Sequence, residues 1–172
     1  MITLRFINPI EWQANAVACA KRFTKSGSII YVTVLRSHHD LLHPFQEAGI
    51  DADRVHYIDL ARHPSTHKHK ETTHHCTTLN SMENLNEVEI AITTTLSKVP
   101  DAALVIDAVS GLFLYHDPDT IGQFLLHITA FARSLGRDCV IVASPPENPE
   151  ERSLIGMVAT LADEVEGKKD LL

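Results

Sequence analysis

The sequence predicts an α/β fold, a three-layer sandwich in which helices cover both faces of a mostly parallel central sheet. Three runs of the chain are continuously apolar and rich in β-branched residues: 29–35, 102–107 and 139–143. Such runs are typical of parallel strands that are buried on both faces. Segments with apolar residues at helical spacing alternate with them, in the strand–helix order of α/β proteins. The 172 residues are enough for one domain, 1–172, with a sizeable core.

The N-terminal half begins with a strand and a capped helix. Asn8 is predicted to be the helix N-cap, with Pro9 at the first helical position and Glu11 closing a capping box. A later helix contains Pro44, so we expect a kink or a late start there. The predicted elements of this half are a strand at 2–7, a helix from 9 to about 24, a strand at 29–35, a helix at 37–48 and a strand at 54–60.

The C-terminal half continues the alternation after a polar loop. This loop, 61–73, has no apolar periodicity and is long for a connection inside a compact domain, so we expect it to be the most mobile part of the chain. Asn84 caps the next helix, with Glu87 three residues on, and Asp117 begins another. The predicted elements of this half are a short edge strand at 76–79, helices at 84–99, 117–135 and 150–162, and strands at 102–107 and 139–143.

Composition and charge argue against several classes of protein. The net charge of −7 leaves no basic excess for neutralising phosphates, which argues against a nucleic-acid-binding protein. The three cysteines show no CxxC spacing, as expected for a reduced, cytoplasmic protein. No signal peptide is visible at the N-terminus, and no run of about 18 apolar residues predicts a membrane span.

Three stretches carry a resemblance to a known superfamily. They are IYVTV at 30–34, AGIDADRVHYID at 48–59 and LVIDAVS at 104–110, and the helix after Asp117 follows them. With these stretches the chain resembles the RecA/KaiC-like ATPases, which have the P-loop NTPase fold, and more narrowly the archaeal KaiC-like proteins that have lost the ATPase motifs. The resemblance covers roughly the whole chain, and the strand that ends at Asp107 is its one recognisable motif.

The phosphate-binding motif of that superfamily is missing from the sequence. The resemblance implies a glycine-rich GxxxxGK[ST] loop after the first strand, whose N–H groups and lysine hold the phosphates. The corresponding residues, 7–14 (INPIEWQA), contain no glycine, lysine or hydroxyl group, and Glu11 adds negative charge at the helix start. The resemblance also implies an acidic pair after the second strand, where this chain has Leu35, Arg36 and Ser37. We therefore expect a degenerate Walker A site that does not hydrolyse ATP and does not bind ATP and Mg²⁺ tightly.

Asp107 is the candidate ligand-binding residue at the carboxyl edge of the sheet. It ends an apolar strand, and in nucleotide hydrolases an acid at this position helps to hold the magnesium of a bound triphosphate. We expect instead that Asp107 caps the following turn through Ser110 or survives from an ancestral site. The alternative is a small molecule bound at this edge by Asn8, Gln13 and Asp107, because open α/β sheets bind ligands there.

Histidines are clustered in and after the polar loop. The chain has 11 histidines, and several of them precede Cys76 closely. Imidazole and thiolate are ligands of zinc and copper, so this tract is a candidate zinc site. Its spacing lacks the two tight pairs of a structural zinc site, and interleaved lysines oppose a cation, so we favour a solvated loop. The candidate metal ligands are His67, His69, His74 and His75.

These observations favour a regulatory or signalling module that works by binding proteins, including a second copy of itself. The resemblance implies self-association, and the helix at 118–135 is placed to bring Leu126 or Phe131 near a neighbour. We expect a homo-oligomer, a dimer ahead of a hexamer, with an exposed sheet edge beyond residues 163–166 that seeks a partner. The alternatives are a residual nucleotide-dependent ATPase that uses Asp107 and a metal-binding protein that uses the loop at 63–76.

Overall fold

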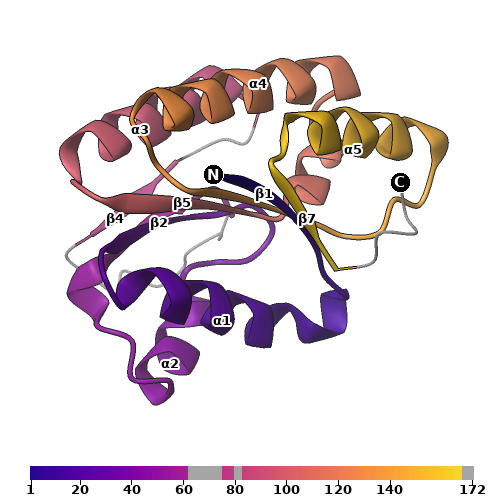
Figure 1. Ribbon diagram of the computed structural model, residues 1–172. Helices are drawn as coiled ribbons and strands as arrows, with labels where there is room; N and C mark the ends of the chain where they lie inside the picture. Colours follow the sequence, from indigo (N-terminus) through magenta and orange to yellow (C-terminus); the bar gives the residue numbers. More distant parts are fainter. Residues whose placement is uncertain (62–74, 80–82, 168–172) are drawn as a thin grey trace.

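The computed structural model, which describes residues 1–61, 75–79 and 83–167, is an α/β sandwich (Figure 1). The described residues form a seven-stranded sheet in the order β4-β3-β2-β5-β6-β1-β7, and each pair of neighbours is parallel. The predicted fold class is therefore confirmed. The strands are β1 (Ile2–Phe6), β2 (Ser28–Thr33), β3 (Val55–Asp59), β4 (Cys76–Thr78), β5 (Ala102–Asp107), β6 (Cys139–Ala143) and β7 (Glu164–Glu166).

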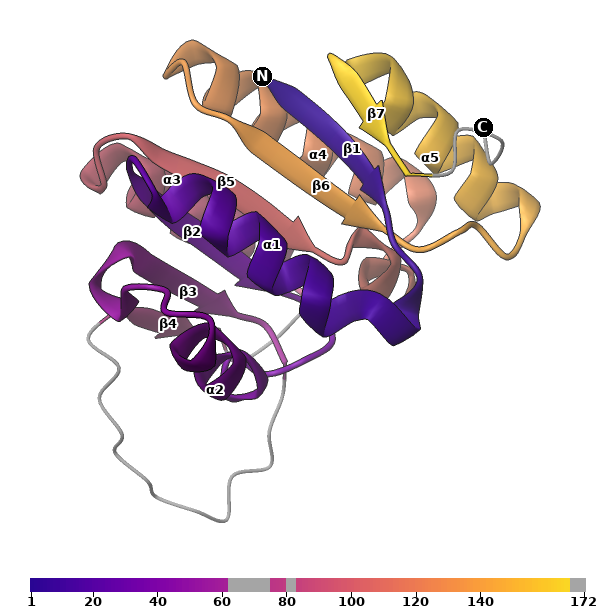
Figure 2. The same ribbon diagram turned by 60° about the horizontal axis from the view of Figure 1, so that its bottom comes forward.

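Helices cover both faces of the sheet, as Figures 1 and 2 show. One face carries α1 (Trp12–Thr24) and α2 (His39–Glu47). The other carries α3 (Leu85–Lys98), α4 (Pro118–Ser134) and α5 (Pro149–Leu161). Within the described ranges, no helix is long and apolar enough to cross a membrane. The described residues also form short 3₁₀ helices: η1 (Pro9–Glu11), η2 (Ala52–Arg54) and η3 (Val109–Leu114).

Local signals in the sequence place most of these elements. Asn8 Oδ1 accepts a hydrogen bond from the N–H of Ile10 at 3.1 Å, so it caps η1, which leads directly into α1. Asn84 caps α3 and donates to Glu87 Oε1 at 3.0 Å. The helix that contains Pro44 begins at His39, two residues after the predicted start, but Pro44 still lies inside it and not in its first turn, so the proline does not account for where the helix begins. The predicted mobile loop at 61–73 lies, apart from Ala61, outside the described residues.

Among the residues that the structure describes, the core consists of two apolar clusters, one on each face of the sheet. Leu104 and Ile106 of β5 pack under α3, α4 and α5, and Val105 between them packs under α1 and α2. Both faces of the central strands are buried, so these strands are apolar at every position rather than at alternate ones.

The strand β7 was not predicted. It is the last strand of the described sheet and pairs on one side with β1, so the expectation that an exposed edge beyond residues 163–166 seeks a partner stays a prediction. Residues 164–166 pair with β1, and Arg5 of β1 forms an ion pair with Glu166. Asp163 Oδ2 accepts a hydrogen bond from the N–H of Ile2 at 2.6 Å. This strand is short and acidic, so apolar periodicity does not reveal it, and long-range polar contacts hold it in place.

The register of the sheet brings three polar residues together at its carboxyl edge. Thr33 of β2 is aligned with Asp59 of β3 on one side and with Asp107 of β5 on the other. The chain leaves β2 through α2 toward β3, but it leaves β5 through α4 on the opposite face toward β6. Open α/β sheets bind ligands where the connections diverge in this way, so the ends of β2 and β5 are the expected place for a site.

Candidate functional site

The carboxylate of Asp107 is held by two side chains that lie far away in the sequence. Trp12 Nε1, at the start of α1, donates a hydrogen bond to Asp107 Oδ2 at 2.7 Å, and the hydroxyl of Tyr31 on β2 donates to the same oxygen. The expectation that Asp107 caps a turn through Ser110 is therefore wrong. Ser110 Oγ accepts instead from the N–H of Ser144 at 2.9 Å, and η3 has Ala108 as its N-cap, with no side-chain cap. The side chain of Asp107 points toward α1, as alternation along β5 requires, and away from the turn.

Burial dominates the electrostatics of this site. It raises the pKa of the Asp107 carboxyl above its ordinary value, although the hydrogen bonds from Tyr31 and Trp12 and the charge of Arg36 act in the opposite direction. Burial and the nearby carboxylate also raise the pKa of Tyr31, so its hydroxyl stays protonated and remains a donor. Within the described structure, Asp107 Oδ1 has no hydrogen-bond partner. The site therefore disfavours negative charge on Asp107.

Trp12 also forms part of a neighbouring surface cavity. The guanidinium carbon of Arg36 lies 4.3 Å from the centre of the Trp12 ring, a cation–π contact. The cavity, about 380 Å³, is lined by residues of η1, of α1 and of the segment after β2, and Gln13 is one of them. Asp107 does not line it, so the structure does not bring the three predicted ligand residues together. The lining residues are Pro9, Ile10, Trp12, Gln13, Arg36 and Asp40.

Of the predicted metal ligands, only His75 lies within the described residues. His67, His69 and His74 lie outside them, so the zinc prediction stays a prediction. The ring of His75 packs against that of His56 with 4.5 Å between the ring centres, and burial together with His75 lowers the pKa of His56. Among the residues that the structure describes, no group of three or more His, Cys, Asp or Glu side chains is arranged to hold a metal ion.

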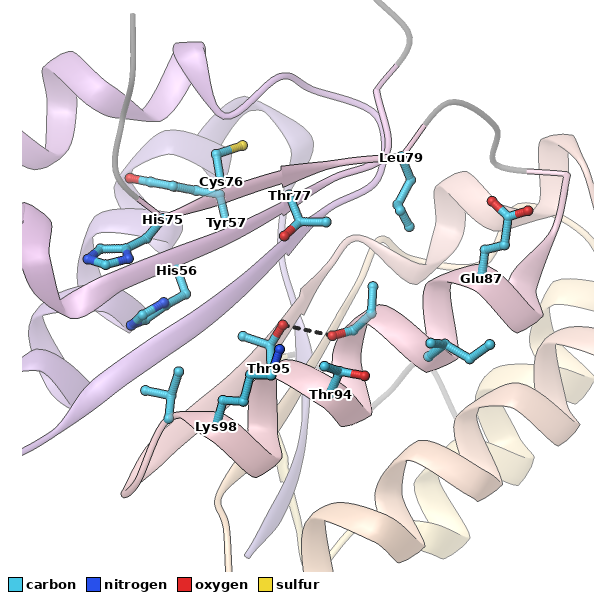
Figure 3. Close-up of a pocket in the computed structure, with 13 residues that line it drawn as sticks. His56, Tyr57, His75, Cys76, Thr77, Leu79, Glu87, Thr94, Thr95 and Lys98 are labelled. Atoms are coloured by element: carbon cyan, nitrogen blue, oxygen red, sulfur yellow. Dashed lines mark hydrogen bonds between the residues drawn. The ribbon is translucent and has the colours of Figure 1, made fainter.

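His56 and His75 lie at one end of a groove between the β3–β4 edge and α3 (Figure 3). Its volume is about 640 Å³, and Thr94, Thr95 and Lys98 of α3 face the two imidazoles across it. The lowered pKa of His56 favours its neutral imidazole, and the described residues that line the groove mix polar and apolar side chains.

Asp59 and His38 form a second polar site that the sequence patterns did not predict. Asp59 ends β3 as Asp107 ends β5, and its Oδ2 lies 2.6 Å from His38 Nδ1. Ser37 Oγ donates to the same oxygen at 3.0 Å, and the N–H of Ala61 donates to Oδ1 at 2.9 Å. Two features of the sequence could have indicated this site. Asp59 ends a strand, and His38 follows the neighbouring strand β2.

Comparison with known proteins identifies the fold. The chain is similar in structure to the KaiC-like protein PH0186 from the hyperthermophilic archaeon Pyrococcus horikoshii OT3, with a TM-score of 0.65 and 14% sequence identity. The fold is KaiC-like. The match covers 95% of this chain and 68% of the other, and at this identity it concerns the fold alone. No protein-family model and no curated protein sequence matches the chain.

Proposed function

We propose that this chain is a KaiC-like domain that does not hydrolyse nucleotides and acts as a regulatory or signalling module by binding proteins. The observation that carries the proposal is that Trp12 and Tyr31 both donate hydrogen bonds to the buried carboxylate of Asp107. In a nucleotide hydrolase this acid helps to hold magnesium. Here one carboxylate oxygen accepts two internal hydrogen bonds, and burial disfavours the charge that a metal would need.

The connection between β1 and α1 supports the same proposal. A phosphate site at a helix start needs free backbone N–H groups that point toward the anion. In η1, Pro9 has no N–H, the N–H of Ile10 donates to Asn8 Oδ1, and the N–H of Glu11 donates to the Asn8 carbonyl oxygen at 2.8 Å. These donors are already satisfied within the turn, and Glu11 adds a negative charge beside them.

The carboxyl edge of the sheet instead presents apolar side chains to solvent. Ile10 is 91% exposed, Leu35 is 52% exposed and Leu114 is 69% exposed. We name these three residues the carboxyl-edge patch. They come from the segments that follow β1, β2 and β5, and Leu35 packs so closely over Gly111 that a Cβ there would lie 2.5 Å from Leu35 Cγ. Exposed apolar residues at one edge of a fold are typical of protein-interaction sites, and we propose that a second copy of this chain binds here to form a dimer.

Sedimentation velocity of the full chain tests this surface. We expect a wild-type dimer that the double variant Ile10→Glu/Leu114→Glu converts to a monomer, because each charge would be buried in the interface. Leu126→Glu on α4 is the matched control. It alters a residue that is 48% exposed on another face, the face that the sequence predicted to lie near a neighbour. A wild-type monomer at high concentration would contradict self-association, and dissociation by Leu126→Glu alone would place the interface on α4.

A further inference from the structure

Cys76, His38 and Asp59 form a cluster at the carboxyl end of β3. We name these three residues the Cys76 cluster. His38 lies just before α2 and is buried, and its Nδ1 is 2.6 Å from Asp59 Oδ2 and 3.6 Å from Cys76 Sγ. Three segments of the chain supply the thiol, the imidazole and the carboxylate: β4, the turn after β2, and β3.

The charges of the cluster follow from its hydrogen bonds. Burial acts to raise the pKa of Asp59, but the hydrogen bonds donated by His38, Ser37 and Ala61 outweigh it and hold that pKa below its ordinary value. Burial also acts against charge on His38, yet the hydrogen bonds to Asp59 and Cys76 raise its pKa to about 9. At neutral pH the imidazole is therefore protonated, and it lies within hydrogen-bond distance of a cysteine sulfur.

The arrangement differs from that of a catalytic triad. In a triad the acid and the nucleophile contact opposite nitrogens of the imidazole, so that the ring can take the nucleophile's proton. Here Asp59 and Cys76 both face Nδ1. His38 accordingly serves as a proton donor held in place by Asp59, and the ring of Tyr57, 5.5 Å away between centres, packs against it.

Cys76 is the accessible thiol of the three in the chain. Cys19 and Cys139 are buried, and burial raises their pKa values to about 11 and about 12. Cys76 is half-buried on the short strand β4. Its sulfur lies on the side of β4 opposite Thr77 and the groove (Figure 3), and the Thr78 hydroxyl is 3.8 Å away. A second polar group thus flanks the sulfur beside the imidazolium.

We propose that Cys76 is a redox-sensitive thiol that small hydroperoxides oxidise to a sulfenic acid, with His38 as the proton donor. The sulfur attacks the terminal oxygen of the hydroperoxide, the S–O bond forms and the O–O bond breaks. The leaving oxygen takes the Nδ1 proton of His38, and the proton lost from the thiol restores the imidazolium. Cys76 is oxidised to Cys–SOH while the hydroperoxide is reduced to water or an alcohol.

The test follows sulfenic acid at each cysteine of the reduced full chain. Hydrogen peroxide is added with dimedone, which traps sulfenic acids, and peptide mass spectrometry gives the rate at each site. In the native protein we expect labelling at Cys76, absent from Cys76→Ser, and faster than labelling of Cys76 in the urea-unfolded chain. A native rate equal to or below the unfolded rate would overturn the proposal, and this comparison needs no variant that has to fold.

A variant series then tests the proton donor. In His38→Asn, with a native circular-dichroism spectrum, we expect the Cys76 rate to fall at least about tenfold, since a positioned proton donor typically contributes about 100-fold or more. A smaller fall overturns the role of His38. Ser37→Ala is the matched control, because it removes one hydrogen bond to Asp59 and leaves the Nδ1 proton in place. A rate as low in Ser37→Ala as in His38→Asn would assign the effect to the whole network and overturn that role as well.

Discussion

Asp59 and Asp107 occupy equivalent places in the sheet, but their pKa values are shifted in opposite directions. Each ends a strand next to β2, each is aligned with Thr33, and both are buried on the α1–α2 side. Asp107 receives hydrogen bonds from two neutral donors, and burial raises its pKa. Asp59 accepts hydrogen bonds from the charged imidazole of His38 and from several further N–H and O–H donors, and these lower its pKa.

The difference shows that the partner of a strand-ending acid decides its chemistry. Neutral donors do not compensate the loss of solvation of a carboxylate, whereas a cation and several N–H and O–H donors do. An aspartate at the carboxyl edge of a parallel sheet is therefore weak support for a metal or nucleotide site until its partners are known. Asp107, the acid that resembles a magnesium ligand, is buried and bonded to Trp12 and Tyr31. Asp59, the acid with a charged partner, lies beside the thiol of Cys76.

The largest expected effect is the loss of stability on neutralising Asp59, measured against the neutralisation of Asp107. Asp59→Asn leaves the His38 imidazolium buried without its counter-charge, so we expect a loss of about 3–5 kcal/mol in the free energy of unfolding at pH 7. Asp107→Asn keeps an oxygen acceptor for Trp12 and Tyr31 and removes a buried charge. We expect this variant to stay within about 1 kcal/mol of wild type or to exceed it. Urea unfolding of both variants measures the difference.

The direction in which stability changes with pH at Asp107 follows from its raised pKa. A carboxyl whose pKa is higher in the folded than in the unfolded state contributes stability below the unfolded value of 3.8 and loses it as pH rises through the folded value. Asn does not titrate, so the free energy of unfolding of Asp107→Asn should increase relative to that of wild type as pH rises. Equal losses in Asp59→Asn and Asp107→Asn would contradict the comparison.

A smaller effect, of about 3 kcal/mol, is expected in the pH dependence of the His38–Asp59 pair, because each pKa unit corresponds to roughly 1.4 kcal/mol. The pKa of His38 is raised from 6.5 to about 9. The pair's contribution is therefore fully present below pH 6.5 and is lost as pH rises through about 9. The unfolding free energy of wild type minus that of His38→Gln, measured from pH 6 to about pH 10, should fall over this window. A difference that stays constant would show that the imidazole is not charged in the folded protein.

The sequence predicts elements more completely than it predicts the site, for a physical reason. Strands such as β5 are recognisable because burial on both faces requires apolar residues throughout, and the Asn84 cap is a local pattern of four residues. The partners of Asp107 lie 95 and 76 residues away at Trp12 and Tyr31. No local pattern encodes such distant pairings, and the same holds for β7, which polar contacts to β1 hold in place.

The central claim, that the Asp107 site has no role in nucleotide hydrolysis, is tested most directly by MgATP. Micromolar affinity corresponds to about 8 kcal/mol, and each charge-assisted hydrogen bond missing from the β1–α1 turn removes roughly 1.5–3 kcal/mol. With purified full chain, calorimetric titration and a phosphate-release assay beside Asp107→Asn should show no binding at micromolar MgATP and no turnover in either protein. Micromolar binding or phosphate release by wild type that disappears in Asp107→Asn would contradict the account.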